Sequence, residues 1–317
     1  MKSIRIRRLL IALLSLALLA PGAALARTAQ RSAAAPGQLE TGGLSGCAQF
    51  SELWQTSELV PQAILSCQIT AAESGKLVIS ADGYALAPGN VANSAYEAAF
   101  TVAVGAATKQ SQYVDVASDS HDGNDQAVSL TAGAGVAAGS HTITFKAGRV
   151  SSTGVPVTVG RASLSVLFVP DSSAGIEVCF AQKSSWSNAT TSATDVAQCS
   201  LTTASGGRVF IFGSGTAHLK DSAYEAVFTA RQVGDTNNAS DRYVNVAANA
   251  NDGTDRAVAT MATKLILSAS TFSVALYGQR SIGSGTVGMR NASLVAVFVA
   301  AAGANPASYC HDIEDNV

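Results

Sequence analysis

The chain has 317 residues, of which 47% are hydrophobic but only 6% are aromatic and 13% are charged, and its formal net charge is -2. This composition is too apolar for a disordered chain and too poor in Lys, Glu and Leu for a helical bundle. A mildly acidic chain also lacks the basic face that nucleic acids and anionic membranes require, so we expect neither as a partner.

The N-terminal segment, residues 1–26, is typical of an export signal. A basic stretch precedes an apolar core from Leu9 to Ala20, and small residues before Arg27 mark a cleavage site. The apolar run is too short for a good membrane span. We therefore expect the signal to be removed and the rest of the chain to be secreted or displayed at the cell surface, without membrane insertion. Residues 27–46, rich in Ala, Gly and Ser, are expected to form a flexible tether.

The remainder of the chain is a duplicated unit. The segment SAYEAAF at residues 94–100 returns as SAYEAVF at residues 222–228, and several later segments return in the same way. Matching segments are separated by about 130 residues throughout, which indicates an internal repeat rather than a chance match. We therefore predict two domains, residues 47–178 and 179–317, each of which opens with a lead-in segment.

Short strands are predicted throughout both copies. Apolar residues alternate along Tyr96 to Val104, which is the period of a half-buried strand, and Tyr224 to Ala230 repeats the alternation. Turn signals such as Asp-Gly separate these segments. With seven or eight strands in each copy, the pattern predicts an all-β chain of two tandem antiparallel β-sandwich domains. A short helix is expected only in the first lead-in, at Ser57 to Ile64.

Two segments of the first copy resemble a known fold. The run AGSHTITF at residues 138–145, followed by an Ala-Ser-Leu-x-Val strand at residues 162–166, resembles the last strands of jelly-roll domains in secreted bacterial and phage surface proteins. The order of predicted strands is similar to that of the TNF/C1q-like sandwich. This resemblance implies jelly rolls that serve in assembly or binding, and it brings no functional residues with it.

The five cysteines of an exported chain are expected to form disulfides. Two pairings respect the repeat. The favoured one closes each domain end to end through Cys67–Cys179 and Cys199–Cys310, because a disulfide across a long loop stabilises more. The other closes the two lead-ins through Cys47–Cys67 and Cys179–Cys199. Each leaves one cysteine over, which is then available for a link to another chain.

An acidic loop is the best candidate for a ligand site. Its carboxylates recur every three residues in the first copy and partly return in the second: Asp119, Asp122, Asp125, Asp252 and Asp255. Ca²⁺ takes six to eight hard oxygen ligands, which such a loop can offer, although the spacing is not that of an EF-hand. The alternative, an Asp-Gly turn with solvated aspartates, is the favoured interpretation. No other cofactor is expected.

Each lead-in contains one tryptophan, Trp54 in the first and Trp186 in the second. A bulky aromatic kept in both copies is most simply a plug over the end of a core, and a sugar-stacking contact is the alternative. No nucleophile elbow or established pair of facing carboxylates predicts catalysis. We therefore expect a non-enzymatic structural, assembly or adhesion protein that associates with itself or with other surface proteins. A glycan-binding module is the alternative function.

Overall fold

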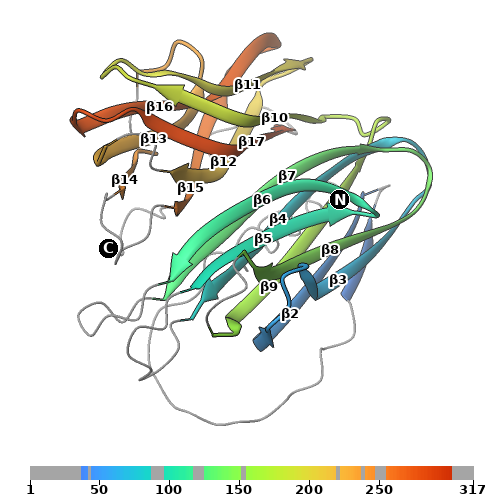
Figure 1. Ribbon diagram of the computed structural model, residues 1–317. Coiled ribbons are helices and arrows are strands. Elements are labelled where there is room, and N and C mark those ends of the chain that lie inside the picture. The colour runs from blue at the N-terminus through green and yellow to red at the C-terminus, as the bar shows by residue number, and fades with distance from the viewer. Residues whose placement is uncertain are drawn as a thin grey trace.

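The computed structural model describes residues 37–41, 44–86, 96–116, 125–150, 155–218, 222–236, 240–246 and 255–301 (Figure 1). This part of the chain consists of β-strands joined by turns and loops, and no helix occurs in it. It therefore also contains no helix long and apolar enough to cross a membrane. The expectation of an all-β chain built from two tandem antiparallel sandwiches is confirmed.

The first sandwich consists of sheets A and B, which pack face to face. In spatial order, sheet A contains β1 (Gly37–Thr41), β2 (Leu44–Thr56), β9 (Val157–Pro170), β4 (Gly75–Ala85) and β7 (Gln126–Val136). Sheet B contains β3 (Gln62–Ala71), β8 (Gly139–Arg149), β5 (Tyr96–Val104) and β6 (Ala107–Val116). Consecutive strands cross from one sheet to the other at most connections, which is the topology of a jelly roll.

The second sandwich repeats this order strand for strand, apart from β1. Sheet C contains β10 (Ile176–Asn188), β17 (Val287–Ala300), β12 (Gly207–His218) and β15 (Asp255–Ile266). Sheet D contains β11 (Thr194–Thr203), β16 (Ser270–Gly283), β13 (Tyr224–Gln232) and β14 (Arg242–Val246). Both copies are therefore jelly-roll-like, as the sequence predicts.

Each sandwich encloses its own apolar core between its two sheets. In β5 and β13 buried side chains alternate with less buried ones over the first residues, as the period-two pattern predicts. The first tyrosine of each strand is buried and equivalently bonded. The Tyr96 hydroxyl donates to the Leu86 carbonyl at 2.7 Å, and the Tyr224 hydroxyl donates to the His218 carbonyl at 2.8 Å. The duplication thus preserves individual hydrogen bonds as well as strand order.

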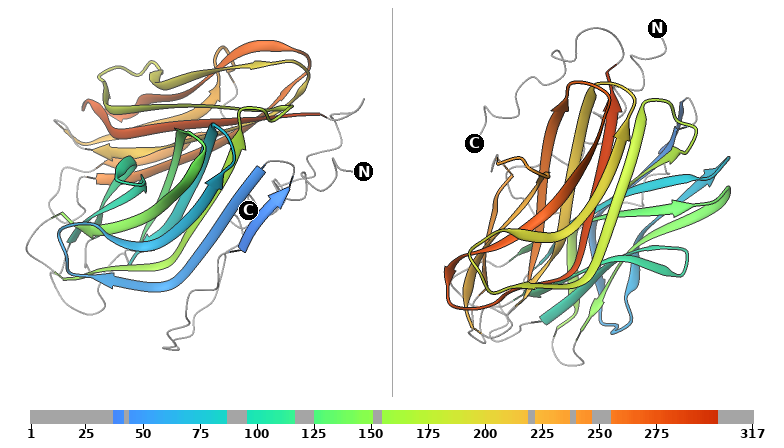
Figure 2. Two further views of the ribbon diagram at one scale, coloured as in Figure 1. Left: turned by 90° about the vertical axis from the view of Figure 1, so that its right-hand side faces the viewer. Right: turned by 90° about the horizontal axis from the view of Figure 1, so that it is seen from above.

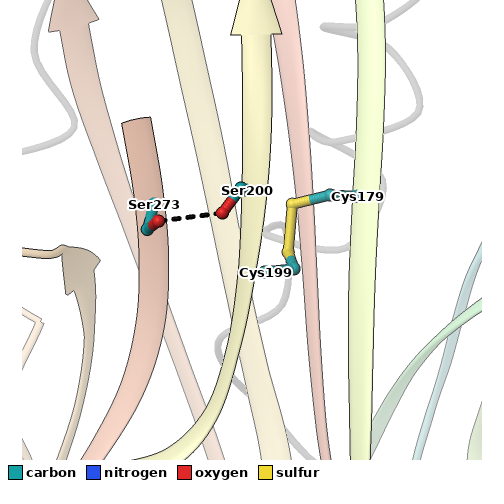
Figure 3. Close-up of a disulfide and its surroundings, with 4 residues drawn as sticks. All are labelled: Cys179, Cys199, Ser200 and Ser273. Carbon is teal, nitrogen blue, oxygen red and sulfur yellow. Dashed lines mark hydrogen bonds between the residues drawn. A yellow bond between two sulfur atoms is a disulfide. The ribbon is translucent and has the colours of Figure 1, made fainter. Parts of the chain in front are cut away.

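One disulfide connects the two sheets of each sandwich. Cys47 in β2 is bonded to Cys67 in β3 with Cα atoms 6.2 Å apart, and Cys179 in β10 is bonded to Cys199 in β11 with Cα atoms 5.9 Å apart (Figure 3). The favoured pairing, Cys67–Cys179 with Cys199–Cys310, is therefore wrong, and the second pairing is the one formed. Geometry outweighs loop length here, because consecutive strands bring their cysteines within bonding reach across the core. Cys310 lies outside the described residues.

The two lead-in segments form strands that belong to the sandwiches. The pair β2 and β3 fills most of the first, and the pair β10 and β11 fills most of the second. The helix expected at Ser57 to Ile64 is wrong, because residues 57–61 form a loop and β3 begins at Gln62. Along β3, exposed and buried side chains alternate with the period of a strand, and this burial decides the conformation.

Candidate functional site: the junction between the two sandwiches

The two sandwiches meet through the outer faces of sheets A and C, with β7 beside β10, β12 and β17 (Figure 1, Figure 2). A third apolar cluster, separate from the two cores, lies between them, and we call it the junction cluster. It comprises Leu44, Leu167, Val169, Ile176, Val178, Val295 and Val297, all buried. Burying one valine or leucine side chain stabilises by about 1.5–3 kcal/mol. The junction cluster therefore holds the two sandwiches together as a hydrophobic core would.

The central strands β9 and β17 supply the junction cluster because both of their faces are apolar. In β9, Phe168 points into the first core, whereas its neighbours Leu167 and Val169 point outward into the junction cluster. In β17, Phe298 lies in the second core while Val297 lies in the junction cluster. A strand that is buried on both faces carries a continuous apolar run instead of an alternating one.

A glycine lets the second sandwich approach the backbone of β7. At Gly133 an added Cβ atom would lie 2.4 Å from the side chain of Phe180, which belongs to β10. Such a separation is far below van der Waals contact, so a larger residue at this position would force the Phe180 ring away. The Phe180 side chain is also packed against the junction cluster. Gly133 therefore sets how closely the two sheets meet.

Buried side chains of β12 cap the open edges of β6 and β7. The Thr131 backbone N–H donates to Ser214 Oγ at 3.0 Å, and the Tyr113 N–H donates to Thr216 Oγ1 at 2.9 Å. Ser214 and Thr216 are fully buried. The edge of a sheet presents unpaired N–H and C=O groups that invite another strand. Here the second sandwich satisfies part of that edge with side-chain hydroxyl groups.

Two glutamines of β6 complete the polar part of the junction. The Gln112 amide nitrogen donates to the carbonyls of Gly215 at 3.1 Å and Val258 at 3.0 Å, while its oxygen accepts from the Ser129 N–H at 3.0 Å. Gln110 donates to the carbonyl of Asn291. Both glutamines are buried. A buried amide stabilises only where its partners are present, so these bonds also fix the register of the two sandwiches.

An acidic group lies at one end of the junction. Glu97 and Asp115 are opposite each other on β5 and β6, and Asp255 from β15 approaches them. The Asp255 N–H donates to Asp115 Oδ2 at 2.8 Å, and Arg290 Nη1 lies 3.5 Å from Asp255 Oδ2. Burial is the main cause that raises the pKa of Asp255 to about 6, with Asp115 raising it further and Arg290 opposing the shift. Burial, Asp115 and Asp255 likewise raise the pKa of Glu97.

The predicted calcium ligands are only partly within the described residues. Asp255 is buried and forms an ion pair with Arg290, and Asp125 is exposed immediately before β7 begins. Within the described ranges, no group of three or more His, Cys, Asp or Glu residues is placed to hold a metal ion. Asp119, Asp122 and Asp252 lie outside those ranges, so a calcium site in their loops stays a prediction.

The two predicted ligand-contact tryptophans differ in burial. Trp186 belongs to the second core, and its ring packs edge-on against Phe228 with centroids 6.2 Å apart. At 6% exposed, Trp186 agrees with the favoured interpretation of a plug over the core and leaves little ring surface for a sugar. Trp54 is partly buried against the first core. It remains the one predicted aromatic contact that is partly accessible.

Comparison with known proteins places the chain in no family. No family model matches, and no curated protein matches. Solved structures that align with it include the tandem CBM22-1–CBM22-2 domains of Paenibacillus barcinonensis Xyn10C, at 11% identity, covering 81% of this chain and 93% of that one with a TM-score of 0.20. The infectious bursal disease virus VP2 subviral particle aligns at 11% identity over 86% and 76%, with a TM-score of 0.27. N-glycanase F aligns at 8% identity over 79% and 96%, with a TM-score of 0.30. Similarities this weak carry no argument about function.

Sequence reasoning missed the residues that build the junction. Gln110, Gln112, Ser214 and Thr216 are ordinary polar residues in ordinary strands, and nothing in their spacing marks them. One signal was available, namely the nearly continuous apolar run at residues 294–299 of the second copy. Such a run indicates a strand covered on both faces, and therefore a second packing partner beyond the sandwich core.

Proposed function

We propose that the chain is a non-enzymatic structural protein that acts outside the cytoplasm, as an assembly or adhesion subunit that associates with itself or with other surface proteins. The observation that carries this proposal is the junction between the sandwiches. Apolar packing and buried hydrogen bonds join the two jelly rolls and give their outer surfaces a defined arrangement. A surface subunit needs such an arrangement, because its contacts must repeat from molecule to molecule.

The disulfides and the leader sequence support the proposed location. Each sandwich contains one disulfide, which joins two consecutive strands. Disulfides persist mainly in oxidising compartments such as the periplasm or the cell exterior. The N-terminal segment has the order of basic, apolar and small residues that directs export. Together they favour a protein that works at or beyond the cell surface.

Light scattering after size exclusion tests the assembly proposal. The full chain, expressed for export, is run over a range of concentrations, once with Ca²⁺ and once with a chelator. We expect a mass that rises with concentration beyond that of one chain. Loss of the larger species in chelator would show that a divalent cation is required and would support the predicted calcium ligands. A single-chain mass at every concentration, together with free release of the chain from intact cells, would contradict the proposal.

Glycan binding is the second candidate, and the partial exposure of Trp54 favours it. Trp54 of β2 is only partly buried against the first core, whereas Trp186 is 6% exposed. Retention on immobilised polysaccharides that is lost in Trp54→Ala would support this function. Tyr243→Ala is the control, since Tyr243 is an aromatic side chain on the surface of the second sandwich, 58% exposed, that no candidate site includes. Retention that survives Trp54→Ala would remove Trp54 as the contact.

A further inference from the structure

The outer face of sheet A is covered by the second sandwich over one half and uncovered by the described residues over the other. The covered half contains Leu167 and Val169 of the junction cluster. On the other half, the side chains of Phe50, Leu53 and Tyr84 are 52%, 64% and 39% exposed. Large apolar side chains that gather on one surface indicate a docking site more often than a solvated face.

Strand register places these exposed side chains next to one another. Leu53 of β2 and Tyr84 of β4 are both paired with Gly160 of β9, which has no side chain. In the adjacent row, Phe50 and Asp82 are both paired with Ser163. Leu86 lies over Gly160, and its side chain would be 3.0 Å from an added Cβ atom there. We call this surface the open-face patch, and it comprises Phe50, Leu53, Asp82, Tyr84, Leu86 and the exposed Arg161.

The second sandwich shows what its counterpart of the open-face patch does. By the repeat, Phe50, Leu53 and Tyr84 correspond to Gln182, Ser185 and Thr216. Thr216 is buried under the first sandwich, and Gln182 donates to the Lys109 carbonyl of β6. Gln182 and Ser185 themselves stay exposed, so in the second copy this face contacts the first sandwich at Thr216 and through the single hydrogen bond of Gln182. In the first copy it is more apolar and has no such cover among the described residues.

The internal junction cannot simply be repeated between molecules. Leu44, Leu167 and Val169 of the first sandwich correspond to Ile176, Val297 and Val299 of the second. Those three residues already pack in the junction cluster of their own chain. A sandwich from another molecule could not use this contact as well, because it would need a surface that the internal junction already occupies. A second head-to-tail contact of the same kind is thereby excluded while the internal junction is formed.

We propose that the open-face patch docks against the open-face patch of a second copy of this chain across a two-fold axis. The contact continues the sheet-on-sheet packing that the junction cluster begins on the same face. The exposed Glu52 and Arg161 give this surface charges of both signs, which a two-fold contact can pair between the two copies. Two-fold contacts are the commonest among homo-oligomers. This inference rests on the proposed function and specifies one of its surfaces.

Sedimentation velocity on the full chain tests the contact. The test variant carries Phe50→Gln and Leu53→Ser, which are the residues that the second sandwich bears at these places and with which it folds. We expect the dimer dissociation constant to rise by about tenfold or more, as for loss of two central apolar contacts. The control carries Tyr243→Thr and Met261→Thr, exposed on β14 and β15, and it should dimerise as the parent does. Equal thermal melts exclude misfolding.

The outcomes separate this inference from the proposed function. Arg161→Glu should weaken the dimer, and added salt should weaken the parent more than this variant. The docking surface is overturned if the Phe50 and Leu53 variant self-associates as strongly as the parent, or if the Tyr243 and Met261 control self-associates more weakly. In either case the assembly proposal stands. A chain that never self-associates and is not held at the cell surface overturns both. A monomer that binds polysaccharide through Phe50 replaces the protein partner with a glycan.

Discussion

At the scale of single residues, the absence of a side chain at position 133 determines how the sandwiches meet. Gly133 lies on the edge strand β7, and the Phe180 side chain from the other sandwich occupies the space where its Cβ would be. Gly135, two residues further along the same strand, has nothing within 4 Å of such an atom. The two glycines thus share a strand and a strand face but differ in whether the junction requires them.

Substitution of the two glycines should separate these roles. Gly133→Ala is expected to lower the free energy of unfolding by about 1–3 kcal/mol, because overpacking forces Phe180 or the backbone to shift. Gly135→Ala should be neutral or slightly stabilising, since an alanine there removes freedom only from the unfolded chain. Urea unfolding of both variants measures the difference. Equal stability of the two variants would contradict the close approach of Phe180.

At the scale of elements, the edge strands β6 and β7 of the first sandwich are partly covered by the second sandwich. Edge strands left open promote aggregation, and natural proteins cover or interrupt them. In the first sandwich, Ser214 and Thr216 of β12 provide part of this cover through side-chain oxygen atoms. The corresponding positions of the first copy are Asp82 and Tyr84, which lie on the open-face patch instead. The repeat has thus diverged where one copy covers the other.

Removal of one capping hydroxyl should be costly. Ser214→Ala deprives the Thr131 N–H of its partner in a fully buried position, which is expected to lower the free energy of unfolding by about 1–3 kcal/mol. Ser200→Ala is the matched control, because Ser200 bonds Ser273 at 2.8 Å on an exposed face (Figure 3). Its effect should stay within about 0.5 kcal/mol. If both variants unfold at the same urea concentration, the edge capping contributes nothing.

At the scale of the whole molecule, the acidic group couples the contact between the sandwiches to pH. Asp255 from the second sandwich is buried beside Asp115 and near Glu97 of the first, and Arg290 alone forms a described ion pair with it. Arg290 and Arg256 both favour the charged form of Asp255, but burial is the largest effect and Asp115 adds to it, so the pKa of Asp255 is raised. Protonation of Asp255 relieves this repulsion and the penalty of burying its charge.

Stability should accordingly fall as pH rises across the mildly acidic range. The pKa of Asp255 is about 6 in the folded protein against 3.8 for the free side chain. Between these two values the folded chain keeps a proton that the unfolded chain has lost, so the free energy of unfolding decreases with rising pH. The raised pKa of Glu97 acts in the same direction.

Urea midpoints at pH 5 and pH 8 test this coupling. Protonation of Asp255 should raise the free energy of unfolding of the parent at pH 5 relative to pH 8. Asp255→Asn should remove this contribution, so the parent and the variant should differ in how much their stability changes between the two pH values. Asp171→Asn provides the control, since Asp171 is an exposed aspartate whose oxygen is 4.0 Å from Lys76. An unchanged pH difference in Asp255→Asn would show that the junction does not sense pH through this residue.

The sequence by itself determined the duplication and the all-β class with two tandem sandwiches, whereas the jelly roll was implied only by a resemblance. These properties are local or repetitive: alternation along Tyr96 to Val104 depends only on the period of a strand, and a repeat is visible without any folding. The short helix at Ser57 to Ile64 failed because burial along β3, rather than local preference, decided that segment.

Only the tertiary structure decided the disulfides, the fate of Trp186 and the junction. The cysteine pairs follow from which strands face each other across a core, and five cysteines spaced by the repeat allow two answers. The junction depends on which outer faces of the sheets meet. Leu167 and Val297, which point outward into it, are residue types found in any buried strand, so the sequence does not distinguish them. Strand periodicity reports whether a face is apolar, but not what covers it, because the covering residues belong to another sheet, and some of them, such as Val295 and Val297, are more than a hundred residues away in the chain.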